Sequence, residues 1–420
     1  MTPDQKRQFA RGFPVHVGVD TGKRTHVLVA RGPDGLRGRP RTVPVSRDGF
    51  EEADAALREQ FPGEPPDRIL VGLEFAGHHG FTFAQFLGVR GYHVVNVLPL
   101  HTKRSKELED NTPLKTDAKD AALICRLVGD GTFVRFPFLV SPYAELRILV
   151  GQHHRLCSEQ IRLKNRLQGL LDLAWPEFLE HFCNLRKGTP IAVLTRWPLP
   201  ADLLQERRSV LLEYVRATSR GQIRAAKMAG LLDAARRTIA MTSAPAERRL
   251  EITQLLARWA LLRRQMRVVV EQVERLVAEC REARILLTVP EVGPLCAAVI
   301  VSEIGVPADY EHPRQVLKLA GMNLIEQSSG MLHGRQRQSK RGRPVLRRQL
   351  YLLGGRWCLR RGLYRQEYEA LLARNGGRRT KAVCSVARKL VPLLFAVMRS
   401  GEPFCAERWA AGRRGRVLQH

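Results

Sequence analysis

The chain has 420 residues, and 69 Lys and Arg against 41 Asp and Glu give it a formal net charge of +28. Such a charge favours binding to a polyanion, so nucleic acid is the expected partner. A hydrophobic fraction of 44% argues against disorder as the main state, and the length predicts two or three domains. There is neither a run of eighteen apolar residues nor an apolar N-terminal signal segment, so we expect a cytoplasmic protein with no membrane partner.

Cysteine usage indicates the same reducing compartment. The eight cysteines are scattered along the chain, with no CxxC pair and no His/Cys cluster at the spacing of a zinc site. We therefore expect reduced thiols that lie mostly in hydrophobic cores.

The first part of the chain alternates β-rich runs with helical patterns. Two runs, 15–19 and 25–30, flank a polar turn that contains Gly22, which predicts a β-hairpin. The pattern that follows predicts a helix at 47–61, a strand at 68–74, a further helix, and a strand at 91–99. This alternation predicts an α/β domain with a mixed sheet.

Four carboxylates stand at the boundaries of predicted elements. Asp20 closes the first strand, Glu74 closes a later one, and Asp117 and Asp120 stand three residues apart near the start of a helix. Each position is also common for a purely structural acid. Brought together, four carboxylates would repel one another unless a divalent cation neutralised them, and Mg²⁺ suits carboxylate and phosphate oxygens.

From about residue 142 to 287 the sequence changes to long segments rich in Leu, Arg and Glu. Their apolar residues recur at helical spacing, which predicts amphipathic helices, partly of coiled-coil type. A segment with Thr and Pro at 188–200 is expected to interrupt these helices as a connector. The pattern fits an ordinary helical bundle as well as arms that pair protomers or reach along a duplex.

The last third of the chain contains a helix-hairpin-helix-like stretch and a serine pair. The stretch "LLTVPEVGPLCAAVIVSEIG" predicts two helices joined by a turn with Pro290, Gly293 and Pro294. Such a turn can present backbone N–H groups to a phosphate, and it can equally be a simple corner between helices. Further on, Ser328 and Ser329 precede a glycine and a run of basic residues, which by itself is typical of a polar turn on a basic surface.

Five blocks, taken in order, resemble the DEDD transposases of the insertion sequence 110 family, which are RNA-guided serine recombinases related to the Piv DNA invertases. The blocks are "VGVDTGKRTH", "LEFAGHHG", "LKTDAKDAALI", "TVPEVGPLCAAVIVSEIG" and "QSSGMLHGRQRQSKRG…LRRQLY". The resemblance implies an α/β plus α protein in three parts. These are a RuvC-like, ribonuclease-H-type mixed-sheet domain at 12–140, a helical, coiled-coil middle at 141–283, and a mainly helical C-terminal transposase domain at 284–410.

The resemblance also implies an activity and its residues. The protein would be the transposase of a mobile insertion element, a site-specific recombinase that cleaves and rejoins DNA strands. Asp20, Glu74, Asp117 and Asp120 would bind Mg²⁺, with Mn²⁺ as the alternative ion. Ser329 would be the nucleophile that forms a phosphoserine intermediate, with Ser328 as the fallback. The basic residues expected to contact nucleic acid are Arg335, Arg337, Lys340, Arg341, Arg343, Arg347 and Arg348.

The partners implied by the resemblance are donor and target DNA, an element-encoded guide RNA, and further copies of the chain in a dimer or tetramer. The location would be the bacterial cytoplasm, with the nucleoid. Charge alone does not separate an RNA partner from a DNA duplex. Two other functions stay open: a metal-dependent, structure-specific endonuclease without a covalent intermediate, and an inactive nucleic-acid-binding scaffold.

Three sites depart from the family pattern. Ala76 stands where the family has a hydroxyl residue, Glu291 stands where it has a glycine, and Arg343 with Pro344 stands where an Asn is usual. None of these is an expected catalytic residue, so the departures bear on nucleic-acid contacts.

Overall fold

The computed structural model describes residues 1–409 except 36, 76, 110–115, 137–139, 223–224, 327–335, 360–363 and 408. The chain forms two compact units, Met1–Phe138 and Leu139–His420. The division lies close to the expected boundary at 140, whereas the boundary at 283 falls inside the second unit and stays a prediction. Among the described helices, none is long and apolar enough to cross a membrane.

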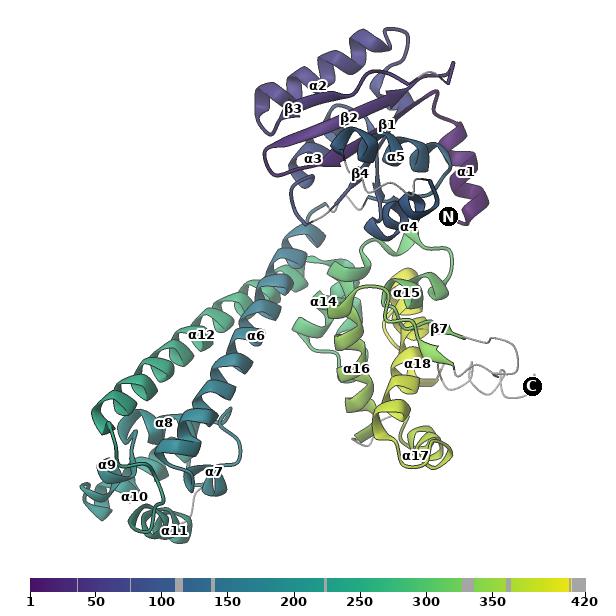
Figure 1. The fold of residues 1–420 in the computed structure, drawn as a ribbon. Coiled ribbons are helices and arrows are strands. Elements are labelled where there is room, and N and C mark those ends of the chain that lie inside the picture. The colour runs from purple at the N-terminus through teal and green to yellow at the C-terminus, as the bar shows by residue number, and fades with distance from the viewer. Residues whose placement is uncertain are drawn as a thin grey trace, which may run out of the picture. The chain divides into compact units, whose positions relative to one another are not determined.

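A mixed six-stranded sheet forms the centre of the first unit (Figure 1). Its strands are β1 (Val15–Thr21), β2 (Thr25–Arg31), β3 (Arg41–Pro44), β4 (Ile69–Glu74), β5 (His93–Val97) and β6 (Val134–Arg135). They lie in the order β3-β2-β1-β4-β5-β6, with β1, β2 and β3 antiparallel and with β4 and β5 parallel to β1. The predicted hairpin and mixed sheet are confirmed. The sequence did not indicate β3 and β6, because both are short and mostly polar.

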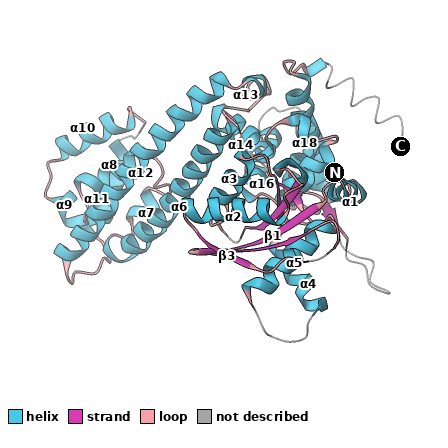
Figure 2. Ribbon diagram, turned by 90° about the horizontal axis from the view of Figure 1, so that it is seen from above, coloured by secondary structure: helices cyan, strands magenta, loops and turns pink. Residues whose placement is uncertain are grey.

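Helices cover both faces of this sheet (Figure 2). Val17 and Val19 face one side, where they share a core with α2 and α3, whereas Leu70 and Val95 face the other side and pack with α5. The short helices α1 and α4 lie against α5. The bounds are α1 (Pro3–Arg11), α2 (Arg47–Gln60), α3 (Phe81–Val89), α4 (Pro99–Glu109) and α5 (Asp117–Gly129), and the turn before β4 is the 3₁₀ helix η1 (Pro66–Arg68).

Two glycines let α5 approach the strands closely. A Cβ at Gly18 would lie 2.2 Å from both the carbonyl oxygen of Ala121 and the backbone nitrogen of Cys125. A Cβ at Gly72 would lie 2.1 Å from Cγ2 of Val128. A larger residue at Gly18 must therefore displace the helix, because the atoms it would meet belong to the backbone and cannot rotate away.

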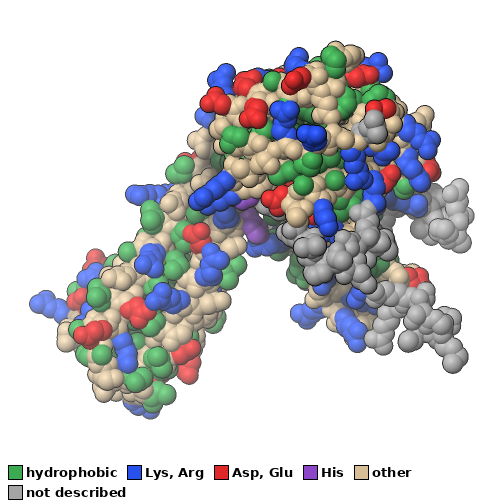
Figure 3. All heavy atoms as spheres, turned by 45° about the horizontal axis from the view of Figure 1, so that its top comes forward, with side chains coloured by type: hydrophobic (Ala, Val, Ile, Leu, Met, Phe, Trp, Pro, Cys, Tyr) green, Lys and Arg blue, Asp and Glu red, His purple; other side chains and the backbone are tan. Residues whose placement is uncertain are grey.

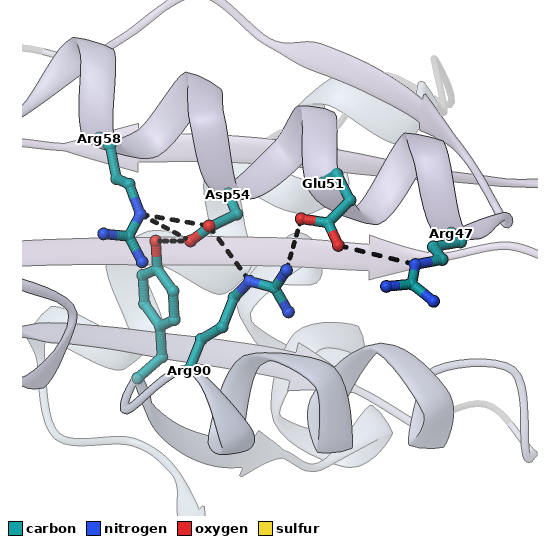
Figure 4. A network of polar contacts seen from close by, with 6 residues as sticks. Arg47, Glu51, Asp54, Arg58 and Arg90 are labelled. Carbon is teal, nitrogen blue, oxygen red and sulfur yellow. Dashed lines mark hydrogen bonds and ion pairs between the residues drawn. The ribbon is translucent and has the colours of Figure 1, made fainter.

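On the opposite face, a polar network joins α2 to the chain that follows α3 (Figure 4). The Asp54 carboxylate accepts hydrogen bonds from Nε of Arg58 and Nε of Arg90, both at 3.2 Å, and from the Tyr92 hydroxyl at 2.7 Å. Arg90 also pairs with Glu51. The buried carboxylate thus has two cations and three donors, which offset the cost of its burial.

We expect Tyr92→Phe to lower the free energy of unfolding by about 1 kcal/mol, because it removes a buried donor to Asp54 while both arginines remain. Urea unfolding at neutral pH measures the loss. Tyr214→Phe is the matched control, since the half-buried Tyr214 donates to a neutral acceptor, the Ala192 carbonyl, at 3.2 Å. Equal losses in the two variants would show that the charge of Asp54 adds nothing to this bond.

Two long helices, α6 (Tyr143–Ala174) and α12 (Pro245–Glu279), run side by side in the second unit (Figure 1). Buried residues recur along α12 at helical spacing, for example Leu262, Val269 and Val273, and they share a core with α6. The predicted long amphipathic helices are confirmed, and their coiled-coil character stays a prediction.

The predicted connector at 188–200 is wrong, because most of this segment is helical. Pro190 lies in the first turn of a helix, where its missing N–H is not needed, and Val193 and Leu194 are fully buried. The segment is part of a helical cluster between α6 and α12. Its helices are α7 (Phe178–His181), α8 (Gly188–Arg196), α9 (Pro200–Leu204), α10 (Arg208–Ser219) and α11 (Ala225–Arg236).

The remainder of the second unit is mainly helical, with one short hairpin. Its elements are α13 (Arg281–Leu286), α14 (Pro294–Ile304), η2 (Pro307–Asp309), α15 (Pro313–Leu319), β7 (Leu324–Ile325), β8 (Arg337–Gln338), α16 (Pro344–Leu359), α17 (Arg365–Arg374) and α18 (Arg379–Ser400). Strands β7 and β8 pair antiparallel. All eight cysteines of the chain are free, as expected, with four buried and three half-buried.

Candidate active site

Asp20 and Glu74 lie on neighbouring strands. β1 and β4 are parallel, and their register pairs Val19 with Leu73, so the next residue on each strand is one of the two acids. Equivalent positions on paired parallel strands point to the same face, which here is the face that α5 covers. The Thr21 hydroxyl joins the two strand ends by donating to the Glu74 carbonyl at 2.7 Å.

The N-terminus of α5 brings two more acids to this face. The Thr116 side chain caps the helix, and carboxylates are favoured in the first turn because the helix dipole is positive there. Asp117 is exposed and Asp120 is 8% exposed. Gly18 holds the helix against β1 two residues before Asp20, on the same face of the strand. The close approach of α5 therefore fixes where the helix acids lie relative to the strand acids.

The four acids form one electrostatic group. Burial raises the pKa of Asp20 from 3.8 to about 6, and the negative charges of Asp120, Asp117 and Glu74, in that order, contribute further. Lys106 acts in the opposite direction and lowers this pKa. The other three carboxylates predicted from the sequence are thus brought within electrostatic range of Asp20.

Lys106 of α4 is a member of the site that sequence reasoning missed. Its Nζ lies 2.6 Å from Oδ1 of Asp120. In the sequence it is one of several charged residues in "HTKRSKELE", and only the packing of α4 on α5 singles it out.

The ligand chemistry of the four acids fits a hard divalent cation, because all of their donors are carboxylate oxygens and their charges repel. The four carboxylates lie farther apart in this structure than the ligands of one metal ion would. Across the described part of the chain, no three His, Cys, Asp or Glu side chains are close enough to hold a metal ion. A cation would therefore have to draw the carboxylates inwards, with the exposed Asp117 and the half-buried Glu74 having the most room to move.

The predicted nucleophile belongs to the segment between β7 and β8. The base of this hairpin is held by the Ser339 hydroxyl, which donates to Oδ1 of Asn323 at 2.7 Å. The part of the chain that the structure describes does not include the expected nucleophile Ser329, its neighbour Ser328, the basic residue Arg335 or Ala76.

The other basic residues predicted to contact nucleic acid fall into two groups. Arg343 and Arg347 are half-buried and donate to backbone carbonyls within the protein. The exposed group consists of Arg337, Lys340, Arg341 and Arg348. The two groups are therefore placed for different tasks, although the sequence presents them as one basic run.

Two family models match this chain. Residues 17–176 match the model of DEDD transposases of the IS110 type, described as "Transposase", and residues 283–369 match "Transposase IS116/IS110/IS902 family". The chain belongs to this transposase family. The first matched region contains the four carboxylates of the transposase, and the second contains its β7–β8 hairpin.

Two relatives are similar to the transposase over nearly its whole length. It is 27% identical over 404 residues to "Insertion element IS116 uncharacterized 44.8 kDa protein" of Streptomyces clavuligerus, covering 93% of this chain and 96% of that one. It is 26% identical over 412 residues to "Insertion element IS110 uncharacterized 43.6 kDa protein" of Streptomyces coelicolor, covering 95% and 97%. The family resemblance inferred from the five sequence blocks is confirmed, and the protein is a transposase of an insertion element of this type.

Two helices, α13 and α14, flank the turn of the transposase that contains Pro290, as predicted. The Trp357 indole donates to the Pro290 carbonyl at 2.7 Å and so ties the turn to α16. Glu291, the residue that replaces a family glycine, has a left-handed φ of 64°. Gly293 caps α14 without a side-chain hydrogen bond. Phosphate binding by the N–H groups of this turn stays a prediction.

Proposed function

We propose that this transposase cleaves and rejoins DNA strands with the carboxylates Asp20, Glu74, Asp117 and Asp120 and with the nucleophile Ser329. The observation that carries the first half is the placement of the acids: Asp20 and Glu74 are equivalent residues of paired parallel strands, and the first turn of α5 brings two more acids to the same face. Burial, and then the charges of the other three acids, raises the pKa of Asp20. A purely structural carboxylate gains nothing from three like charges. Their grouping on one sheet face favours a role in binding a cation and the phosphates of a substrate.

The serine supplies the covalent step. Its Oγ attacks the phosphorus of a DNA phosphodiester and gives up its proton to a base, while one P–O bond to a sugar oxygen breaks and that oxygen leaves as a protonated hydroxyl. The phosphoserine ester keeps the energy of the broken bond, so attack by another sugar hydroxyl rejoins a strand and releases the serine without a nucleoside triphosphate. Mg²⁺ or Mn²⁺ held by the carboxylates would stabilise the negative charge that develops on phosphate and sugar oxygens.

The strand order in the sheet of the first unit is evidence for our proposal that this unit is a RuvC-like, ribonuclease-H-type domain. Three antiparallel strands are followed by two parallel ones in the spatial order 3-2-1-4-5. This order places Asp20 on a central strand and Glu74 on its parallel neighbour, with the acids of α5 across the same face. The arrangement agrees with the order Asp, Glu, Asp-x-x-Asp in the sequence.

The partners we propose are donor and target DNA, an element-encoded guide RNA, and further copies of the chain in a dimer or tetramer. The net charge of +28 supports a polyanionic partner, and Lys and Arg side chains are spread over both units (Figure 3). Exchange of strands between two duplexes needs several cleavages, which supports more than one copy at work.

The test is a denaturing gel of the full-length protein, co-expressed with the noncoding DNA that flanks its gene and incubated with labelled donor DNA and Mg²⁺. We expect a protein-linked DNA band in the wild type, and we expect both Ser329→Ala and Asp117→Ala to abolish it. Ser328→Ala, which changes the neighbouring hydroxyl, is the matched control and should keep the band.

Each alternative function gives a different gel. Nicked DNA without a covalent band, unchanged in Ser329→Ala, would identify a metal-dependent endonuclease whose serines belong to a turn. Tight, salt-sensitive binding without any cleavage would identify a nucleic-acid-binding scaffold. If the band is lost in Ser328→Ala but kept in Ser329→Ala, Ser328 is the nucleophile.

A further inference from the structure

Arginine side chains donate hydrogen bonds to backbone carbonyls at the C-terminal ends of α14 and α15. Nη1 of Arg343 donates to the Glu303 carbonyl at 2.6 Å and lies 3.4 Å from Oε2 of the same residue. Nη1 of Arg347 donates to the Ala320 carbonyl at 2.9 Å. The last carbonyls of a helix have no partner within it and carry partial negative charge, so both arginines act as C-terminal caps.

Backbone hydrogen bonds connect the residues that flank the β7–β8 hairpin. Ser339 directly follows β8, and its N–H donates to the carbonyl of Asn323, which directly precedes β7, at 2.9 Å. The side chains of the same two residues are also hydrogen-bonded. Four residues later, the Arg343 N–H donates to the carbonyl of Leu319, the last residue of α15, at 2.8 Å. The hairpin is therefore fastened at its base, and the chain that follows it is attached to the end of α15.

A third arginine reaches the end of α14 from the long helix α6. Nε of Arg147 donates to the Ser302 carbonyl at 2.9 Å. Burial, and to a lesser degree the charge of Arg343, lowers the pKa of Arg147 to about 10. Two guanidinium groups are held near one another here because backbone carbonyls and the Glu303 carboxylate attract both.

The exposure of the side chains separates these caps from the rest of the basic run. The side chain of Arg343 is 27% exposed, and the Glu303 carboxylate beside it is 13% exposed. Arg337 and Arg341, by contrast, are exposed, as a phosphate contact would require. Both contacts of Arg343 come from Nη1, whose direction is fixed by the planar guanidinium, whereas the ammonium of lysine is a point charge on a flexible stem.

We propose that Arg343 and Arg347 are positioning residues that fix strands β7 and β8 on the ends of α14 and α15, so that the described base of the hairpin keeps one orientation when DNA binds. Arg337 and Arg341 then provide the contacts to backbone phosphates. This inference rests on the proposed role of Ser329, since that serine lies between β7 and β8 in the sequence.

Arg→Lys variants test positioning, because they keep the charge and lose the planar guanidinium that directs the N–H groups. We expect Arg343→Lys and Arg347→Lys to form the covalent serine–DNA adduct about ten to a hundred times more slowly in single-turnover experiments at saturating DNA, with unchanged affinity for DNA. Circular dichroism confirms that each variant is folded at the assay temperature. Arg399→Lys is the matched control, because Arg399 also donates to a backbone carbonyl, that of Glu311 at 3.1 Å, and should leave the rate unchanged.

Arg→Gln variants test phosphate contact through the salt dependence of binding, which needs no catalysis. We expect Arg337→Gln and Arg341→Gln each to reduce the slope of log affinity against log salt by about 1, and Arg343→Gln to leave it unchanged.

Two results would overturn this inference and leave the proposed function standing. One is a salt slope that Arg343→Gln reduces as much as Arg341→Gln does. The other is an unchanged rate of adduct formation in Arg343→Lys. The absence of any adduct in the wild type would overturn the proposed function and the inference with it.

Discussion

Asp20→Asn is expected to raise the free energy of unfolding at neutral pH by about 1 kcal/mol and to lower strand cleavage about 100-fold or more. The gain in stability arises because burial and the charges of three other carboxylates both disfavour ionised Asp20, and the neutral amide removes both costs. The loss of activity arises because an amide oxygen is a weaker ligand for a hard cation and carries no charge. Urea unfolding and the adduct gel measure the two effects.

The pH dependence of this gain has a definite sign. The pKa of Asp20 is about 6 in the folded protein against 3.8 as a model value, so between these values the folded state binds more protons than the unfolded state. The stability contributed by protonated Asp20 is therefore present at low pH and lost as the pH rises through about 6. The advantage of Asp20→Asn should be complete above about pH 6 and absent below about pH 4.

Asp67→Asn is the matched control, because Asp67 is an exposed acid of the same unit, and its stability should stay within about 0.5 kcal/mol of wild type. Mg²⁺ provides a second readout that is independent of catalysis. A cation held by the four acids stabilises the wild type more than Asp20→Asn, so added Mg²⁺ should narrow or reverse the difference. A variant less stable than wild type in the absence of metal would contradict the repulsive grouping of these acids.

Gly18→Ala is expected to lower the free energy of unfolding of the first unit by about 3 kcal/mol and to abolish cleavage. The new methyl group would lie 2.2 Å from backbone atoms of Ala121 and Cys125, so α5 must move away from β1. Asp117 and Asp120 would move with it, away from Asp20. Urea unfolding and the adduct gel again provide the measurements.

Gly72→Ala separates this effect from simple crowding. Its Cβ would meet the side chain of Val128 at 2.1 Å, so the double variant Gly72→Ala with Val128→Ala should recover part of the lost stability and activity. No side-chain truncation can relieve Gly18→Ala. Gly63→Ala, which has nothing within 4 Å, is the neutral control. Full activity in Gly18→Ala would show that the position of α5 does not set the site.

The elements that the sequence predicted well are those defined by local periodicity. The β-hairpin, the strand that ends at Glu74 and the helix that starts at Asp117 all have a regular apolar pattern and a clear start or end signal. The ordered acids could be assigned to one site because they close strands or open a helix in an α/β alternation. The connector at 188–200 was mispredicted because Thr and Pro indicate a break in sequence, although Pro190 is acceptable in the first turn of a helix.

The features that the sequence did not reveal depend on contacts between distant segments. Lys106 enters the site only because α4 packs on α5, and Gly18 matters only because α5 crosses β1 at that residue. Arg343 and Arg341 look alike in a basic run, and only the helix end near Glu303 distinguishes them. Periodicity and composition contain no information about such pairs.

The cost that ionised Asp20 imposes on the fold has a consequence for the fate of the insertion element itself. A copy of the gene that loses Asp20 would still produce a folded, strongly basic protein. That protein would occupy the same DNA ends without cutting them and so compete with active copies in the same cell. One substitution at Asp20 would thus convert an agent of the element's spread into an inhibitor of it.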